Sequence, residues 1–502
     1  MNEERHVPPE GWLRKSLGEM VELNYGKGLP AKVRSLSGKT PVYGSNGVVG
    51  RHDKALTGSP VIVIGRKGSV GEIHLASVPC WPIDTTYFVD KFPSGLDATF
   101  LFRYLKSQRI GDLDRSTAVP GINREDVYRL SVPLPPLAEQ RRIVAKIEAL
   151  FDQSRTARQA LDRVPPLLKK FRQSVLAAAF RGDLTRDWRE QSPNVEPASI
   201  LLEQVRTHRL RHYQEQVKRA KAERQRAPRK LAHLDHPEPA MPNVDELPES
   251  WAWATLEFLA SPEPRSVQSG PFGSNLHHSE FQDTGVLAVG IDNVLDGRFT
   301  IGSQHRISFE KYEQLKKYTA RPLDVLITVM ATVGRCCFVP EDLETAIITK
   351  HVYRISVDRK LCEPSYLMNA LRGCPAVQEQ LYGEIQGVTR PGINGEILKR
   401  LNIPVAPLAE QRVIISRVET LLKQAEAIDA VVEATRRRID RLEQSILARA
   451  FHGDLVPQDP NDEPASALLE RVHSERSIGT PSRRLAGYQE RKRKRGGKKA
   501  DV

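Results

Sequence analysis

The 502-residue chain carries 75 Lys and Arg against 62 Asp and Glu, a formal net charge of +13, and 39% of its residues are hydrophobic. This length predicts about three or four folded parts. No stretch approaches the roughly 18 apolar residues of a membrane span, and the polar start MNEERHVPPEGW does not resemble a secretory signal. We therefore expect a cytoplasmic protein with no membrane partner. Five irregularly spaced cysteines make a disulfide framework or a zinc site unexpected.

The positive charge is concentrated in two segments. Residues 206–230 contain ten Lys and Arg against two Glu, and residues 483–499 contain nine against one. Such segments commonly bind polyanions, and nucleic acid is the first candidate. The sequence leaves open the alternative that they are solvated charged helices or linkers.

A repeat organises the whole chain. A shift of 271 positions places PLAEQR at 136–141 on PLAEQR at 407–412, and QSVLAAAFRGDL from Gln173 on QSILARAFHGDL from Gln444. An EPAS motif and an opening motif, PPEGW or LPESW, also occur once in each copy. The sequence therefore predicts two copies of one plan, each with a variable block followed by a nearly constant block.

Each constant block predicts a long amphipathic helix. Apolar positions alternate spacings of three and four for about five heptads, starting at Ile143 and again at Ile414, which is typical of a coiled-coil seam. Each helix would be roughly 50 Å long, and each seam offers the other a partner. Two helices packed separately on globular domains are the alternative.

Proline and glycine mark the expected ends of these helices. Proline-rich segments precede Leu137 and Leu408, and both helices are expected to end near Gly182 and Gly453. The pair Pro165-Pro166 lies inside the first seam, where it predicts a kink or a break.

The variable blocks, 12–135 and 251–405, are rich in short β-type runs interrupted by glycine, such as PVIVIGRKGSVGEIHL and TAIITKHVYRISV. GSVG at 68–71 corresponds to ATVG at 331–334, and a helical stretch follows each. A common scaffold with divergent loops is the interpretation. Divergent loops on a shared scaffold indicate that the two copies bind different targets.

Motifs of known catalytic chemistry are incomplete. GKT at 38–40 lacks the earlier glycine and the following helix of a phosphate loop, and His278-Ser-Glu280 lacks the P-C-x-x-C partner of zinc deaminases. G-x-S-x-G and H-E-x-x-H do not occur. We therefore expect neither a catalytic residue nor a metal site in this chain.

The constant blocks carry a family resemblance. PLPPLAEQRRIVAKIEAL, LLKKFRQSVLAAAFRGDL, LPESWAWATL and the second PLAEQR block together resemble the specificity subunit of Type I restriction-modification systems. The resemblance covers nearly the whole chain. In the variable blocks it is limited to elements such as YGSNGVVG, GRKGSVG, WPIDTTYFV and SGPFGSNL.

The resemblance implies a non-catalytic subunit that binds double-stranded DNA. Each variable block would be a target-recognition domain that reads one half of a split site, and the helices would set the gap and dock two methyltransferase subunits. Two ATP-dependent restriction and translocation subunits would complete the complex. No cofactor is implied for this chain, because S-adenosylmethionine, ATP and Mg²⁺ would be bound by the partner subunits.

The expected fold class is α+β, with two α/β target-recognition domains separated by a pair of long antiparallel coiled-coil helices in a pseudo-twofold repeat. The expected parts are the first recognition domain (1–135), the first spacer helix region (136–190), a basic helical linker (191–245), the second recognition domain (246–405), the second spacer helix region (406–456) and a basic tail (457–502).

Base readout requires donors and acceptors on loops that reach a groove. In the first domain the candidate DNA-binding residues are Tyr43, Ser45, Asn46, Arg66, Lys67, Ser69, Thr85 and Tyr87. In the second they are Ser274, Asn275, His277, Asn293, Thr332, Arg335, Lys350 and Arg390. For each residue, a turn position or a surface charge is the alternative.

Two other functions remain open from the sequence. One is a coiled-coil scaffold whose globular ends bind proteins, with the basic segments serving only solubility. The other is a self-sufficient nuclease whose site has no known motif.

Overall fold

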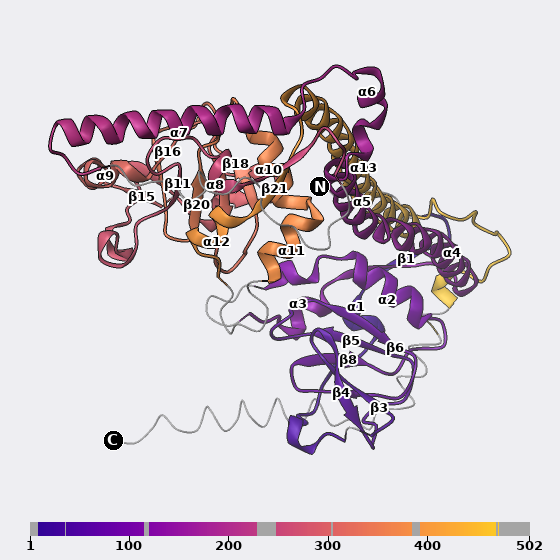
Figure 1. Cartoon of the computed structure of the whole chain (residues 1–502). Helices are drawn as coiled ribbons and strands as arrows, with labels where there is room; N and C mark the ends of the chain where they lie inside the picture. Colours follow the sequence, from indigo (N-terminus) through magenta and orange to yellow (C-terminus); the bar gives the residue numbers. More distant parts are fainter. Residues whose placement is uncertain are drawn as a thin grey trace, which may run out of the picture. The chain divides into compact units, whose positions relative to one another are not determined.

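The computed structural model describes residues 9–35, 37–114, 120–227, 247–302, 305–383, 392–467 and Glu470. The chain divides into two compact units: unit 1 comprises residues 1–162 and 432–502, and unit 2 comprises 163–431. The basic segment 483–499 lies outside the described residues, and 206–230 is described as far as Ala227. Each unit holds one variable block and parts of both constant blocks (Figure 1).

Unit 1 is built on a four-stranded antiparallel sheet of order β2-β8-β5-β6, beside a three-stranded sheet of order β4-β3-β7 in which β3 and β7 run parallel. A further pair, β1 and β9, joins the two ends of the variable block. The strands are β1 (Leu13–Ser16), β2 (Asn24–Tyr25), β3 (Thr40–Gly44), β4 (Gly47–His52), β5 (Val61–Gly65), β6 (Ile73–Ala76), β7 (Trp81–Pro82), β8 (Thr86–Val89) and β9 (Ser131–Leu134).

The apolar run of β5 is continuous because both of its faces are buried. Ile62 and Ile64 pack in the core with α1 to α3, while Val61 and Val63 pack in a second cluster with Tyr43. The main sheet is therefore the middle of three layers. The helices of unit 1 are α1 (Leu17–Met20), α2 (Ala98–Ser107), α3 (Arg124–Tyr128), α4 (Leu137–Asp162) and the last part of α13 (Leu408–His452).

Unit 2 repeats this plan on a larger scale. Its main sheet has the order β11-β20-β17-β18, its second sheet the order β15-β12-β19-β16 with β12 parallel to β19, and β10 pairs with β21. The strands are β10 (Ala252–Thr255), β11 (Val267–Ser269), β12 (Val286–Val289), β13 (Val294–Leu295), β14 (Arg298–Phe299), β15 (Arg306–Ile307), β16 (Thr319–Ala320), β17 (Val325–Thr328), β18 (Cys336–Phe338), β19 (Ala346–Ile348), β20 (Val352–Ile355) and β21 (Asn402–Val405).

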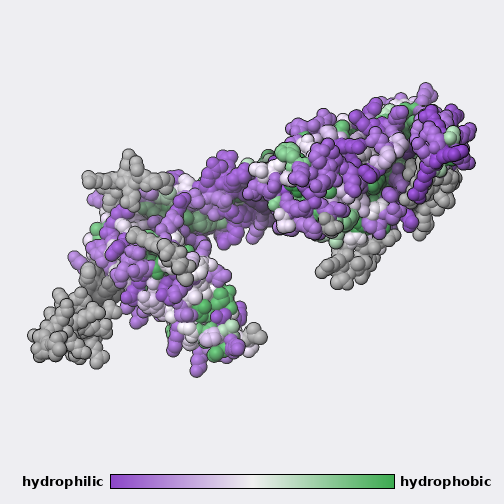
Figure 2. Space-filling view, turned by 90° about the vertical axis from the view of Figure 1, so that its left-hand side faces the viewer, coloured by the Kyte–Doolittle hydropathy of each residue, from purple (hydrophilic) through white to green (hydrophobic). Residues whose placement is uncertain are grey.

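The helices of unit 2 are α5 (Val164–Phe180), α6 (Arg186–Gln191), α7 (Ala198–Ala222), α8 (Leu256–Leu259), α9 (Phe309–Leu315), α10 (Pro364–Gly373), α11 (Pro375–Gly383), α12 (Gly395–Arg400) and the first part of α13. Several of these helices pack against the main sheet of unit 2, and α9 packs against its second sheet. Within the described ranges, no helix combines the length and the apolar character that crossing a membrane requires. Figure 2 shows a mostly hydrophilic surface on the face in view, with hydrophobic side chains gathered only in small areas.

The expected helix ends and the expected interruption are confirmed. The first constant block forms two helices, α4 and α5, that meet at Arg163, because Pro165 and Pro166 have no N–H to donate to the preceding turn. The second block forms one helix of 45 residues, which corresponds to about 68 Å and exceeds the expected length.

In unit 1 the constant motifs meet at one place, which we call the junction. The indole of Trp12 donates a hydrogen bond of 2.9 Å to Glu139, the glutamate of PLAEQR at the start of α4. The amide of Gln458, which follows the end of α13, donates to the other oxygen of Glu139 at 3.3 Å. Burial raises the pKa of Glu139. The backbone N–H of Ala465, in the EPAS motif, donates to the carbonyl of Gly11 at 3.1 Å.

The neighbouring glutamine fixes the same helix start. Gln140 is fully buried and donates to the carbonyls of Gly95 and Pro135 at 3.0 and 2.9 Å, and it accepts from the N–H of Asp97 at 2.8 Å. The first turn of α4 is thereby tied to the loop before α2.

Unit 2 contains an equivalent junction. Trp251 donates to Glu410 at 2.9 Å, and Thr185 and Arg189, which follow the end of α5, donate to the other oxygen at 2.6 Å each. The N–H of Ala198 donates to the carbonyl of Ser250 at 2.9 Å. In both units the start of one constant helix is therefore bonded to the segment that follows the other.

Glycine is required where each helix end enters its junction. Gly182 and Gly453 have φ values of +81° and +88°. A Cβ would lie 2.6 Å from Pro248 at the first position and 2.3 Å from Pro9 at the second. Both prolines belong to the opening motifs, which explains why glycine and proline recur together in the repeat.

We predict that Glu410→Ala lowers the free energy of unfolding by roughly 3–5 kcal/mol, because it leaves the Arg189 cation and the Trp251 indole in a buried site without their acceptor. Denaturant unfolding of the full chain measures this. Glu419→Ala is the matched control, since Glu419 is exposed on the same helix and should change stability by less than about 0.5 kcal/mol. Equal effects of the two substitutions would contradict the role of the junction.

Candidate nucleic-acid interface

Four backbone segments of unit 1, at residues 45, 66–67, 85 and 122, are joined by hydrogen bonds. We call the region that they form the loop edge. The hydroxyl of Ser45 donates to the carbonyls of Lys67 and Thr85, the latter at 3.0 Å. The N–H of Arg66 donates to the carbonyl of Thr85 at 2.9 Å, and the N–H of Ile122 donates to the carbonyl of Arg66 at 3.2 Å. Residues that lie up to 77 positions apart in the sequence are thus held side by side.

The predicted residues of unit 1 divide into surface and interior positions. Asn46, Lys67 and Ser69 are exposed, and Tyr43, Arg66 and Thr85 are half-buried. Ser45 and Tyr87 are buried, and the Tyr87 hydroxyl donates to the carbonyl of Ile122 at 3.2 Å. These two side chains fix the geometry of the loop edge, while the other six can reach a ligand.

The glycine that opens the GRKGSVG segment allows the loop to close tightly. A Cβ on Gly65 would lie 2.2 Å from the carbonyl oxygen of Ser69. No side chain fits there, so the chain can turn back and present Lys67 and Ser69 at the surface.

Unit 2 has a loop edge with the same backbone bonds. The N–H of Val329 donates to the carbonyl of His351 at 3.0 Å, and the N–H of Ile393 donates to the carbonyl of Val329 at 3.0 Å. Met330 forms an isolated bridge with Gly392, as Lys67 does with Gly121 in unit 1. The backbone is retained while the side chains differ.

Of the predicted residues of unit 2, Thr332, Arg335 and Lys350 belong to this loop edge. Arg335 and Lys350 are exposed, and the hydroxyl of Thr332 is buried with no hydrogen-bond partner among the described residues. Burial, together with the charge of Lys350, lowers the pKa of His351, so this imidazole is neutral at physiological pH.

The remaining predicted residues of unit 2 lie elsewhere. Ser274 and Asn275 belong to a 3-10 helix (Gly273–Asn275), and His277, which is exposed, precedes the next one (His278–Glu280). Asn293 is buried, where it accepts from the N–H of Gly290 at 2.8 Å and donates to the carbonyl of Thr300 at 3.0 Å. Arg390 lies outside the described residues.

Two residues that the sequence did not single out join the loop edge of unit 1. Tyr25 lies on β2 beside Tyr87, with ring centres 5.1 Å apart. Arg124 begins α3, and its guanidinium carbon lies 5.3 Å from the Tyr25 ring centre, the same distance as that of Arg66. No motif connects these three residues in the sequence, although stacking between arginine and tyrosine is a common feature of nucleic-acid binding sites.

Most of the basic segment lies in α7, which is part of unit 2 (Figure 1). Arg209 donates to the carbonyl of Phe258 at 2.8 Å and pairs with Asp358. Other cations of this helix, including Arg211, Lys218 and Lys221, are exposed. The helix therefore carries a positive surface on a fixed element.

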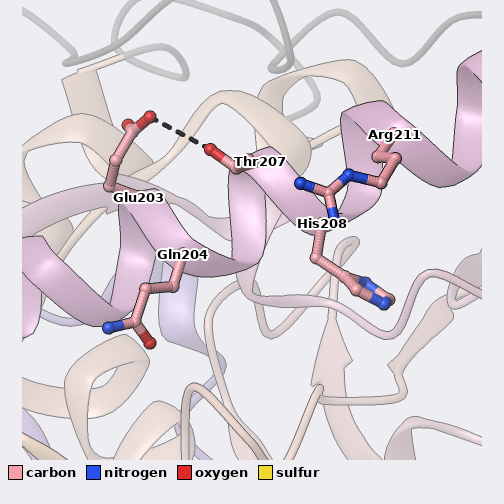
Figure 3. Close-up of a pocket in the computed structure, with 5 residues that line it drawn as sticks. All are labelled: Glu203, Gln204, Thr207, His208 and Arg211. Carbon is pink, nitrogen blue, oxygen red and sulfur yellow. Dashed lines mark hydrogen bonds between the residues drawn. The ribbon is translucent and has the colours of Figure 1, made fainter.

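A shallow cavity of about 340 Å³ lies along α7 and is lined by Glu203, Gln204, Thr207, His208 and Arg211. Figure 3 shows these side chains along consecutive turns of the helix, with Thr207 hydrogen-bonded to Glu203 at 3.4 Å. The five lining residues carry polar or charged side chains, and their carbon atoms contribute most of the surface of the cavity.

Within the described ranges, no group of three or more His, Cys, Asp and Glu side chains could hold a metal ion. All five cysteines are buried and unpaired. Burial raises the pKa of Cys337 to about 12 and that of Cys374 to about 11, so these thiols are not poised as nucleophiles.

Comparison with known proteins identifies the family. Residues 9–165 and 298–434, more than half of the chain, match the model described as Type I restriction modification DNA specificity domain. The chain therefore belongs to this family.

Curated relatives cover most of the chain. The Type I restriction enzyme EcoBI specificity subunit of Escherichia coli is 28% identical over 72% of this chain and 68% of its own length. The EcoDI specificity subunit of Escherichia coli is 25% identical over 93% of this chain and 96% of its own length.

A solved structure shares the fold. It is described as the structural basis underlying complex assembly and conformational transition of the type I R-M system, and it covers 89% of this chain and 100% of its own, with a TM-score of 0.61 and 22% identity.

We predict that Arg66→Ala weakens binding to the cognate site by about 1–3 kcal/mol, because a half-buried guanidinium at the loop edge can pair with a guanine. Titration of cognate and unrelated duplexes at fixed salt measures the change. Unchanged affinity and unchanged site preference would remove Arg66 from the interface.

Proposed function

We propose that this chain is the DNA-recognition subunit of a Type I restriction-modification complex. Each unit contributes one target-recognition domain, assigned to 1–135 and 246–405, and each domain reads one half of a bipartite site in double-stranded DNA. Membership in the specificity family supports the class of function.

The proposal depends on one observation: the two units share one scaffold, but the side chains at their loop edges differ. The main sheets have the same strand order, and the backbone bonds of Arg66 recur at Val329. The exposed side chains at these edges differ, with Lys67 in one unit where Met330 stands in the other. Equivalent frames with different side chains are suited to reading two different half-sites.

Contacts inside each unit support an antiparallel coiled coil of α4 and α5 with α13. In unit 1, Arg158 pairs with Asp440 at 2.8 Å, and Asp162, one turn later, pairs with Arg436 at 2.6 Å, one turn earlier. In unit 2, Arg172 of α5 pairs with Asp429 of α13. The residue number rises along α4 while that of its partner on α13 falls, as is expected for antiparallel helices.

The junctions support a pseudo-twofold repeat. Each joins the start of one constant helix to the segment that follows the other, and the bond between tryptophan and glutamate is the same in both. A subunit with this symmetry can set the gap between two half-sites and dock two methyltransferase subunits in equivalent positions, with two restriction and translocation subunits completing the complex.

The chain itself is proposed to be non-catalytic. S-adenosylmethionine, ATP and Mg²⁺ would be bound by the partner subunits. The high thiol pKa values of Cys337 and Cys374 are consistent with a role in recognition.

We predict that the full chain, assembled with the methyltransferase subunits of its system, enriches a bipartite motif from a randomised duplex pool, because its two loop edges differ. A protein-binding scaffold would enrich nothing. The same pool incubated with the purified chain and Mg²⁺ should stay intact, and cleavage would indicate the nuclease alternative.

We also predict that the double substitution Lys218→Gln and Lys221→Gln reduces the slope of log K against log salt concentration by about 1 for each phosphate that is no longer neutralised, with the motif unchanged. Both lysines are exposed on α7. Lys423→Gln, exposed on α13, is the control and should leave the slope unaltered. Deletion of 483–499 tests the second basic segment in the same titration. Unchanged salt slopes in both experiments would show that neither segment contacts DNA.

A further inference from the structure

The loop edge of unit 1 contains a cluster of two arginines in contact with three tyrosines. The guanidinium carbons of Arg66 and Arg124 each lie 5.3 Å from the ring centre of Tyr25, and that of Arg66 lies 5.7 Å from the ring centre of Tyr87. Arg124 is also 5.7 Å from the ring of Tyr128. Tyr25 is 53% exposed, so the cluster reaches the surface.

The two cations are not neutralised. Neither Arg66 nor Arg124 forms an ion pair with a carboxylate among the described residues, and the Nε of each is buried with no hydrogen-bond partner there. Arg66 also donates a bond of 3.0 Å to the backbone carbonyl of Asp84, which carries no charge. Two guanidinium groups on one ring repel each other, and burial increases the cost, so the cluster favours a ligand rich in acceptors.

The corresponding place in unit 2 keeps one tyrosine and loses the rest. Tyr25 pairs with Tyr87 across β2 and β8, and in unit 2 Ser269 pairs with Tyr353 across β11 and β20. The backbone bonds of Arg66 belong there to Val329.

The second arginine is absent as well. Arg124 is the first residue of α3 after the capping residue Asn123, and Gly395 is the first residue of α12 after the capping residue Asn394. A Cβ at Gly395 would lie 3.1 Å from the Tyr353 ring, so this site has little room for a side chain. Three residues around a shared tyrosine therefore change together.

We propose that Tyr25, Arg66 and Arg124 form a guanine-reading element that gives unit 1 a base preference absent from unit 2. The proposal rests on the proposed DNA-recognition function and adds Tyr25 and Arg124 to its residues. Contact with the phenol ring restricts the motion of the two guanidinium groups, which lowers the entropy lost when they bind. A fixed guanidinium presents two parallel donors, and the major-groove edge of guanine presents two acceptors, O6 and N7.

The test is motif enrichment with the full chain in its methyltransferase complex. Arg124→Gln and Tyr25→Ala should each reduce the preference for guanine at one position of one half-site by roughly 5- to 150-fold, the range for removing a bidentate pair of bonds to a base. The other half-site should be enriched as in the wild type, which verifies that the variants fold. Arg124→Lys keeps the charge and should still abolish the preference, because an ammonium group cannot form the planar pair of donors.

Arg129→Gln is the matched control. It removes the same charge five residues away, and Arg129 is exposed, pairing with Asp126 at 3.3 Å outside the cluster. The DNA motif that this variant enriches should be the same as that of the wild type.

Two outcomes would overturn the inference. A motif unchanged by Arg124→Gln would exclude base reading, and uniformly weaker binding with a smaller salt slope would identify a phosphate contact instead. Failure of the wild-type complex to enrich any bipartite motif would reject the proposed function itself.

Discussion

The buried hydrogen bond between a tryptophan indole and a glutamate at the start of each constant helix is the interaction on which the rest of the structure depends. Trp12 with Glu139, and Trp251 with Glu410, attach each helix to the beginning of its own variable block. Segments from the far end of the other constant block then complete the site. Because the tryptophan, the glutamate, the glycine and the EPAS alanine each belong to a repeated motif, these motifs recur together: PLAEQR, the glycine after the helix, EPAS and the opening tryptophan meet at one junction.

The same frame allows variation at the loop edges. Backbone-to-backbone bonds hold the loops of both units, and these bonds do not depend on which side chains the loops carry. Arg66 and Val329 can therefore occupy equivalent positions without a change in strand order. Side chains that determine a binding preference are thus separated from the contacts that determine the fold.

Much of the fold could be predicted from the sequence, because its signals are local. Prolines and glycines gave the helix ends, the prolines at 165 and 166 gave the interruption, and runs such as VIVI gave the strands. The burial of Glu139 and Glu410 could not be predicted, since charged side chains at the start of a helix are normally exposed. Their partners lie far away in the sequence and become visible only in the folded chain.

The candidate site was predictable only in part, for the same reason. Lys67 precedes a turn that contains glycine and Arg335 follows one, and both side chains are exposed. Ser45 lies in a turn and Asn293 in a short 3-10 helix, but their side chains bond to nearby carbonyls and are buried. Tyr25 and Arg124 are separated by about a hundred residues and meet because β2 pairs with β8 and α3 follows the bridge at Gly121.

The division of the chain into units also has a consequence for its biosynthesis. Unit 2 is a continuous stretch from Arg163 to Val431, whereas unit 1 needs a segment that begins at Val432, and the ion pair between Arg142 and Asp462 spans 320 residues. On the ribosome, the later-encoded unit is thus the first to have all of its parts. Unit 1 stays incomplete until the segment that begins at Val432 has been translated, so its unpaired surfaces are exposed for longer than those of unit 2.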